Sequence, residues 1–130
     1  MRKLYFYLLP LVLLIINLTA CAQQGERHSM TVSELRDKLN DKDSNFVLLD
    51  VRTDEELTGP LGHIDGIIHI PLQELKQRIT ELSKYNDKEI AVICRSGNRS
   101  NTATGFLRMN GFDAVNVEGG MTEYRRTEQK

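Results

Sequence analysis

Two short apolar runs, each ending at a polar residue, do most to limit the folds open to this chain. The run from Phe46 to Leu49 leads into Asp50, and the run from Ile90 to Ile93 leads into Cys94. A short run that is apolar on both faces is typical of a buried strand in a parallel sheet. Helices must cover both faces of such a sheet, so the two runs predict an α/β domain.

Segments with helical spacing lie between and around these runs. Val32, Leu35 and Leu39 follow Thr31, which forms a capping-box pattern with Glu34, so residues 32–39 are predicted to be a helix. We also expect helices at 71–82, from about 99 to 109 and at 121–126, a helical turn at 54–57, and strands at 64–70 and 114–117. This alternation predicts a single domain with a mainly parallel central sheet flanked by helices. In such folds ligands bind beyond the carboxyl ends of the strands, where Cys94 is placed.

The first twenty residues have the pattern of an export signal. Arg2 and Lys3 precede an almost wholly apolar run from Leu4 to Leu18. A retained membrane helix is the alternative, but the run is shorter than the roughly 20 apolar residues that a spanning helix needs. It closes on the sequence LTAC, which resembles the lipobox of bacterial lipoproteins and implies that Cys21 is acylated and becomes the new N-terminus.

We therefore interpret residues 1–20 as a lipoprotein signal peptide, 21–30 as a polar tether and 31–128 as the folded domain. More than one acyl chain gives stable anchoring. The protein is then expected to be exported and held by lipid on a bacterial membrane, facing the periplasm or the cell surface.

Composition limits the class of protein further. The chain has 130 residues, two cysteines and a formal net charge of −1, which gives no indication of nucleic-acid binding. If Cys21 carries lipid, Cys94 has no intramolecular disulfide partner in a compartment where structural cysteines are normally paired. Such a cysteine is either buried and inert or retained for chemistry.

The residues that follow Cys94 favour chemistry. A tight turn leading into a helix would point backbone amides into one concavity at the positive end of the helix dipole, where a thiolate is favoured over a thiol. Without this context, a lone cysteine at the end of an apolar strand is more often part of the core. We predict that Cys94 is a nucleophile in an anion-binding loop. The expected substrate-binding residues are Arg95, Ser96, Gly97, Asn98, Arg99 and Ser100.

The loop sequence CRSGNRS resembles the active-site sequence Cys-Arg-x-Gly-x-Arg-Ser of the rhodanese-like domains. Three further landmarks recur in the order found in that family, and the match covers most of residues 31–126. They are LLDVR at 48–52 followed by two glutamates, GHIDGI at 62–67, and the double glycine at 119–120. Ile67 stands where the family usually has alanine, and Tyr124 where it often has tryptophan, so the core is expected to differ slightly.

The resemblance implies a sulfurtransferase. The Cys94 thiolate would take sulfane sulfur from a small anionic donor such as thiosulfate, hold it as a persulfide, and pass it to cyanide, a thiol or a protein acceptor. Arg95 and Arg99 would bind the donor while the loop amides stabilise the sulfur. Asp50, Arg52 and Glu56 are expected to support the loop rather than react. His63 is structural in the family, and no cofactor or metal is implied.

Two alternatives remain. The first is a phosphatase or an arsenate reductase, because the related cell-cycle phosphatases share the fold and a loop cysteine. In those phosphatases five residues separate the cysteine from the arginine. Only four residues separate Cys94 from Arg99, and the smaller ring suits one sulfur atom better than a tetrahedral phosphate. A sulfur-carrier or protein-binding module without turnover would use the same residues as the enzyme.

Overall fold

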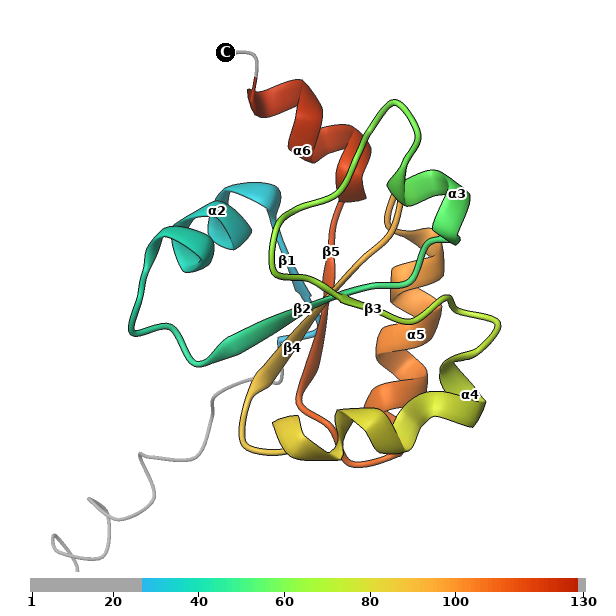
Figure 1. Cartoon of the computed structure of the whole chain (residues 1–130). Coiled ribbons are helices and arrows are strands. Elements are labelled where there is room, and N and C mark those ends of the chain that lie inside the picture. The colour runs from blue at the N-terminus through green and yellow to red at the C-terminus, as the bar shows by residue number, and fades with distance from the viewer. Residues whose placement is uncertain (1–26, 129–130) are drawn as a thin grey trace, which may run out of the picture.

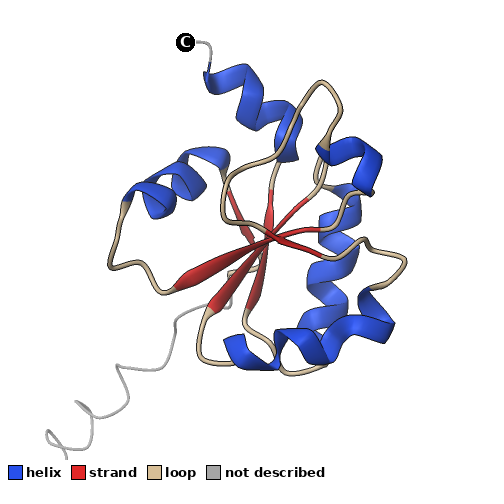
Figure 2. Cartoon of the chain, viewed as in Figure 1, coloured by secondary structure: helices blue, strands red, loops and turns tan. Residues whose placement is uncertain are grey.

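The computed structural model describes residues 27–128, so the proposed signal peptide, Cys21 and most of the tether lie outside the described residues. The described part contains one five-stranded sheet with all neighbouring strands parallel, in the order β1-β5-β4-β2-β3 (Figure 1, Figure 2). The strands are β1 (Ser29–Met30), β2 (Phe46–Asp50), β3 (Ile68–His69), β4 (Glu89–Ile93) and β5 (Ala114–Val117). The prediction of an α/β domain with a parallel central sheet is confirmed.

Helices cover both faces of the sheet. On one face lie α2 (Val32–Asn40) and α6 (Gly120–Glu128), and on the other lie α4 (Leu75–Arg78), the 3₁₀ helix η1 (Ile79–Tyr85) and α5 (Asn98–Met109) (Figure 1). The short helix α3 (Asp54–Leu57) follows β2. The predicted capping box of α2 is present, with Thr31 and Glu34 bonded reciprocally. No helix within residues 27–128 is long and apolar enough to cross a bilayer.

Strand β4 is buried on both faces, and its alternation orients the cysteine. Ile90, Val92 and Cys94 pack in the cluster on the α5 face, whereas Ala91 and Ile93 belong to the cluster beneath α2 and α6. Successive side chains of a strand point to opposite faces, so this division follows from the period of two. Each fully buried aliphatic side chain contributes about 1.5–3 kcal/mol to the free energy of folding. The buried strand thereby fixes Cys94 on the α5 side of the sheet.

The structure differs from the expected elements in three places. The continuous helix predicted for residues 71–82 is wrong, because the chain changes to 3₁₀ winding at Ile79. Winding of three residues per turn places Ile79 and Leu82 along one line toward the core. The strand predicted at 64–70 shrinks to two residues, because Gly66 takes a left-handed turn with φ of 78°.

The third difference concerns the predicted tether. Ser29 and Met30 form the edge strand β1, which pairs with β5, and only 1% of the Met30 surface is exposed. A two-residue strand has no periodicity for a sequence pattern to reveal. Its partner strand β5 lies more than eighty residues later in the chain and supplies the hydrogen bonds that define β1.

Helix α6 begins directly against the cysteine loop. The amide of Met121 donates to the Cys94 carbonyl at 2.8 Å, and the amide of Thr122 donates to the Arg95 carbonyl at 3.0 Å. Gly120 lies at this contact with φ of 55°, and a Cβ atom there would lie 2.3 Å from the Cys94 carbonyl oxygen. Glycine is therefore required where α6 meets the loop.

Gly120→Ala is expected to lower the free energy of unfolding by about 1–3 kcal/mol, because the new methyl group overlaps rigid backbone in a left-handed conformation. Gly105→Ala is the matched control. Gly105 is exposed within α5 and has open space around it, so alanine is expected to raise stability by about 0.5–1 kcal/mol. Urea unfolding of both variants measures the two effects. Equal stability of Gly120→Ala and the wild type would contradict the packing described here.

Candidate active site

The Cys94 sulfur lies under a loop that turns back over the end of β4. Its residue is 1% exposed, and its Sγ accepts hydrogen bonds from the Gly97 amide at 3.1 Å and the Ser100 hydroxyl at 3.3 Å. Gly97 is left-handed, with φ of 103°, and caps α5, which begins at Asn98, one residue before the predicted start. The loop and the first turn of α5 therefore close on one sulfur atom.

Two opposing effects set the ionisation of this thiol. Burial raises the pKa of Cys94, and hydrogen bonds from the Ser100 hydroxyl and from the amides of Ser100, Gly97 and Ser96 lower it. Together the hydrogen bonds outweigh burial, so the pKa of Cys94 lies below its ordinary value. The positive end of the α5 dipole acts in the same direction. The loop therefore makes the Cys94 thiol more acidic than an ordinary cysteine.

Asn116 on β5 is a site residue that the sequence analysis missed. Its Oδ1 accepts from the Ser100 hydroxyl at 2.6 Å, closer than the Gly97 carbonyl at 3.1 Å. Ser100 has one hydroxyl proton, which Asn116, Gly97 and the Cys94 sulfur all compete for. The signal was the alternation of β5: Val115 and Val117 pack under α2 and α6, which turns Asn116 toward the α5 face shared with Cys94.

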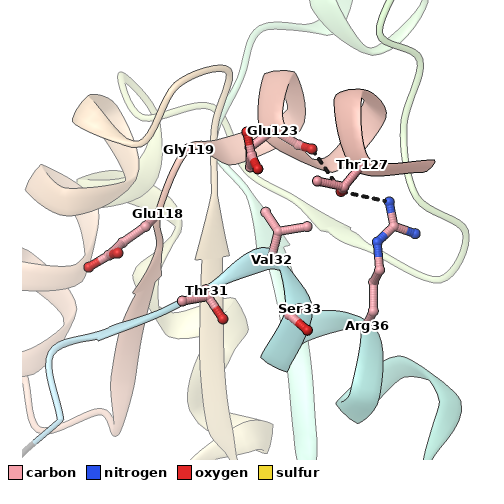
Figure 3. A pocket seen from close by; sticks show the side chains of 8 residues that line it. All are labelled: Thr31, Val32, Ser33, Arg36, Glu118, Gly119, Glu123 and Thr127. Atoms are coloured by element: carbon pink, nitrogen blue, oxygen red, sulfur yellow. Dashed lines mark hydrogen bonds between the residues drawn. The ribbon is translucent and has the colours of Figure 1, made fainter. Parts of the chain in front are cut away.

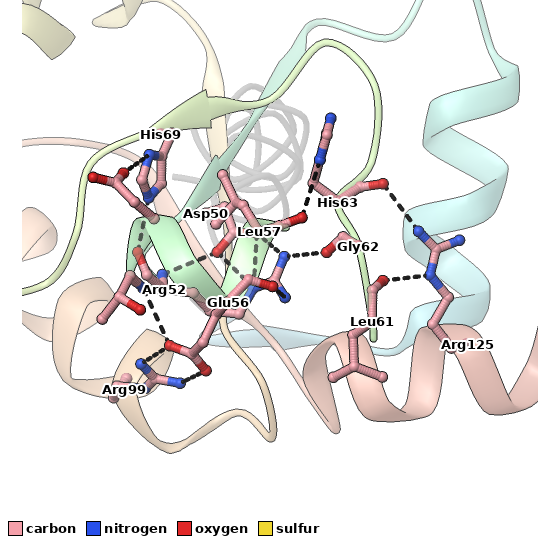
Figure 4. A network of polar contacts seen from close by, with 12 residues as sticks. Asp50, Arg52, Glu56, Leu57, Leu61, Gly62, His63, His69, Arg99 and Arg125 are labelled. Atoms are coloured by element: carbon pink, nitrogen blue, oxygen red, sulfur yellow. Dashed lines mark hydrogen bonds and ion pairs between the residues drawn. The ribbon is translucent and has the colours of Figure 1, made fainter. Parts of the chain in front are cut away.

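Asp50 and Arg52 form a buried ion pair beside the loop (Figure 4). The Arg52 guanidinium donates to both carboxylate oxygens of Asp50, with the shortest distance 2.7 Å, and is only 1% exposed. It also donates to the carbonyls of Glu56 at 3.2 Å and Gly62 at 2.8 Å. Arg52 therefore ties the segment after α3 to the end of β2, as a supporting residue would.

Glu56 connects this network to the cysteine loop. Both of its carboxylate oxygens accept from the Arg99 guanidinium, at 2.6 and 2.7 Å. The hydrogen bonds from Arg99 lower the pKa of Glu56 to about 2, even though burial raises it. The pair contributes stability above the ordinary carboxyl pKa and loses it as the pH falls through about 2, so it is intact at neutral pH.

The two arginines of the loop, both expected to bind substrate, lie in different surroundings. Arg99 faces Glu56, whereas the exposed Arg95 side chain has no hydrogen-bond or ion-pair partner among residues 27–128. Ser96 and Asn98 are exposed on the loop, and Gly97 and Ser100 are buried beneath it. The predicted substrate-binding set is thus brought together around Cys94, with Arg95 as its free cation.

His63 lies in the support network rather than among the residues that contact the sulfur. Its Nδ1 is 3.3 Å from the Leu57 carbonyl, and its own carbonyl accepts from Arg125 at 2.9 Å (Figure 4). These contacts agree with the structural role that the resemblance implies.

A separate cavity of 590 Å³ lies between α2 and α6 (Figure 3). Arg36 reaches it but is occupied, because its guanidinium stacks 4.0 Å from the centre of the Tyr124 ring and donates to Thr127. The residues that line this cavity include no thiol, so it offers no second cysteine nucleophile.

The site is thus a cysteine held by backbone amides at the carboxyl end of a parallel strand in an α/β domain. Comparison with known families agrees with this class. The model of the rhodanese-like domain matches residues 31–127, and the chain belongs to that family.

Two named relatives are similar in sequence to this domain. The putative sulfurtransferase YtwF of Bacillus subtilis (strain 168) is 38% identical over 96 residues, which span 74% of this chain and 88% of the relative. The putative sulfur carrier protein YrkF of the same organism is 44% identical over 85 residues. That match spans 65% of this chain but only 44% of YrkF, so YrkF contains further sequence outside the shared domain.

A solved structure agrees with the fold. The crystal structure of SSP1007 from Staphylococcus saprophyticus superposes with a TM-score of 0.67 at 36% sequence identity. The match covers 75% of this chain and 92% of that chain. The relatives therefore support a sulfurtransferase or a sulfur carrier built on this domain.

Ser100→Ala is expected to raise the pKa of Cys94, because it removes a hydroxyl whose hydrogen bond to Sγ lowers that pKa. The rate of iodoacetamide labelling against pH measures this pKa. Asn101→Ala, an exposed change on the next residue, is the control and should leave the profile unmoved. An unchanged midpoint in Ser100→Ala would show that the hydroxyl does not stabilise the thiolate.

Proposed function

We propose that this domain is a sulfurtransferase that carries sulfane sulfur as a persulfide on Cys94 and accepts it from an anionic donor such as thiosulfate. The observation that supports this most is the Cys94 sulfur itself, which accepts from the Gly97 amide and the Ser100 hydroxyl. These donors stabilise a negative charge on Sγ without a neighbouring base. The family membership and the relative named as a putative sulfurtransferase support the same reaction.

The first half-reaction balances without an added oxidant or reductant. The Cys94 thiolate attacks the outer sulfur of thiosulfate, a new S–S bond forms, and the bond between the two thiosulfate sulfurs breaks. Its electron pair leaves with sulfite. The second half-reaction is the attack of an acceptor on the outer sulfur of the persulfide, which returns the electron pair to Sγ and regenerates the thiolate.

A sulfur-carrier role is the second candidate, because the relative named as a putative sulfur carrier is 44% identical across the shared domain. A carrier would form the same Cys94 persulfide and give it to a protein partner. Loading is therefore common to both proposals, and the acceptor distinguishes them.

Incubation of the protein with thiosulfate is expected to increase its intact mass by one sulfur atom, and cyanide is then expected to release one equivalent of thiocyanate. Cys94→Ser should show neither, because it lacks the thiolate that attacks the donor. An aryl phosphate assay run in parallel tests the phosphatase alternative. Absence of added sulfur in the wild type would refute the proposal, and turnover of the aryl phosphate would favour the alternative.

We further propose that lipid on Cys21 anchors the domain to a membrane. β1 runs parallel to β5, with Ser29 opposite Asn116, and Asn116 is opposite Val92 of β4, so the tether joins the edge strand close to the level of Cys94.

Cys21→Ser is expected to abolish labelling of the full chain by a radioactive fatty acid in cells and to move the protein from the membrane to the soluble fraction. Cys94→Ser is the matched control, because it removes the other cysteine and leaves the lipobox-like sequence intact. Continued labelling of Cys21→Ser would disprove the anchor.

A further inference from the structure

The Ser100 hydroxyl has three acceptors within reach where α5 packs on β5. The Asn116 Oδ1 atom lies 2.6 Å from Ser100 Oγ, the Gly97 carbonyl oxygen 3.1 Å and the Cys94 sulfur 3.3 Å. Ser100 is fully buried, so bulk water does not compete for its proton. A serine hydroxyl has one proton to donate. The direction of that proton therefore decides how much stabilisation the sulfur receives.

Asn116 is the strongest of the three acceptors while the sulfur is uncharged. Its Oδ1 is the closest to Ser100 Oγ and accepts from no other residue within 27–128. The Gly97 carbonyl already accepts from the Asn101 amide at 3.0 Å, in the first turn of α5. The sulfur of a neutral cysteine is a weak acceptor. The hydroxyl proton therefore lies with Asn116 when Sγ carries no charge.

Ionisation of the sulfur reverses this order. A hydrogen bond to a charged acceptor is roughly twice as strong as one between neutral groups, so a thiolate draws the proton away from Asn116. Breaking the bond between Ser100 and Asn116 offsets part of that gain. The thiolate is thus stabilised less than it would be by a hydroxyl with no competing acceptor. In return, the buried hydroxyl keeps a partner whenever the sulfur is neutral.

We propose that Asn116 is a positioning residue that acts on Cys94 through the Ser100 hydroxyl, holding its proton while Sγ is uncharged and yielding it as charge develops there. In sulfur transfer, Sγ loses its charge when the persulfide forms and regains it when an acceptor attacks the outer sulfur. Asn116 thereby limits the acidity of Cys94 and keeps its thiolate a stronger nucleophile. The statement about sulfur transfer rests on the proposed function, whereas the statement about acidity does not.

The charged groups near Cys94 stay unchanged in the test of this inference. Arg99 is paired with Glu56, and Arg52 is paired with Asp50. The Arg95 side chain is exposed on the loop. Substitutions at Ser100 and Asn116 alter none of these groups, so a change in the ionisation of Cys94 reports on the hydroxyl and its competing acceptor.

The pH dependence of Cys94 alkylation tests the inference without a sulfur donor. Iodoacetamide labelling is followed by mass spectrometry of the peptide that contains Cys94, which separates it from Cys21. Asn116→Leu, of similar volume, removes the acceptor and is expected to lower the midpoint. Asn116→Val is a second variant without an acceptor, because a β-branched side chain suits a buried strand. Asn116→Asp should raise the midpoint, because a carboxylate holds the proton more tightly and repels the thiolate.

A double variant distinguishes action through Ser100 from a general change in packing. In the Ser100→Ala background the hydroxyl is absent, so Asn116→Leu should produce no further shift of the midpoint. Thr104→Val is the matched control, because it removes another buried hydroxyl one turn further along α5. The Thr104 hydroxyl has no hydrogen-bond partner in the described part of the chain, and its loss should leave the midpoint unmoved.

Single-turnover kinetics test the consequence for sulfur transfer. A thiolate of lower pKa attacks more slowly and leaves more readily, with about a threefold change in the rate of attack for each tenfold change in acidity. At a pH where Cys94 is fully ionised in both proteins, Asn116→Leu should load sulfur from thiosulfate more slowly than the wild type. Once loaded, it should release that sulfur to cyanide faster.

The outcomes separate this inference from the function on which part of it rests. A midpoint in Asn116→Leu and Asn116→Val at or above that of the wild type would overturn the inference, as would a further shift in the double variant. Midpoints that move as expected in a protein that takes no sulfur from thiosulfate would overturn the proposed function and leave the role of Asn116 in the acidity of Cys94 standing.

Discussion

The hydrogen bonds to the Cys94 sulfur depend on the orientation of the loop peptides. The amides at the start of α6 fix that orientation by donating to the loop carbonyls. The Arg95 carbonyl accepts from Thr122, and in a trans peptide the next amide, that of Ser96, points the opposite way, toward the sulfur. The start of α6 therefore helps to orient an amide that lowers the pKa of Cys94. Gly120 permits this approach and Gly97 permits the turn, so two glycines far apart in the sequence serve one sulfur atom.

The buried pair of Arg52 and Asp50 has a similar role on the other side of the site. Burying two charges costs several kcal/mol per ion, and their attraction offsets this only when the remaining donors are also satisfied. Arg52 meets that condition, because it also donates to the carbonyls of Glu56 and Gly62. An apolar residue of equal volume would fill the space but would not fix the segment that faces the cysteine loop. The ion pair is thus better explained by the way it positions this segment than by a gain in the stability of the fold.

The sequence predicts the parts of this structure that depend on local pattern. The strands β2, β4 and β5, the capping box of α2 and the cysteine loop all follow from runs and spacings of neighbouring residues. The parts that it does not predict depend on distant partners. β1 exists because β5 offers a free edge, and the role of Asn116 becomes visible only once Ser100 and Cys94 are known to share its face of the sheet. The difference between Arg95 and Arg99 likewise needs Glu56, which is forty-three residues from Arg99.

The position of Arg99 also bears on the choice between sulfur and phosphate. A loop that binds a phosphate dianion must direct amides and an arginine at the oxygens that surround the cysteine. Here the Gly97 amide already lies 3.1 Å from Sγ, and the Arg99 guanidinium is engaged by both oxygens of Glu56. A phosphate in this loop would have to displace a carboxylate whose pKa of about 2 keeps it charged at neutral pH. The Cys94 sulfur itself needs no such displacement, because the Gly97 amide and the Ser100 hydroxyl already donate to Sγ. The short spacing between Cys94 and Arg99 and the pairing of Arg99 with Glu56 therefore favour sulfur transfer for independent reasons.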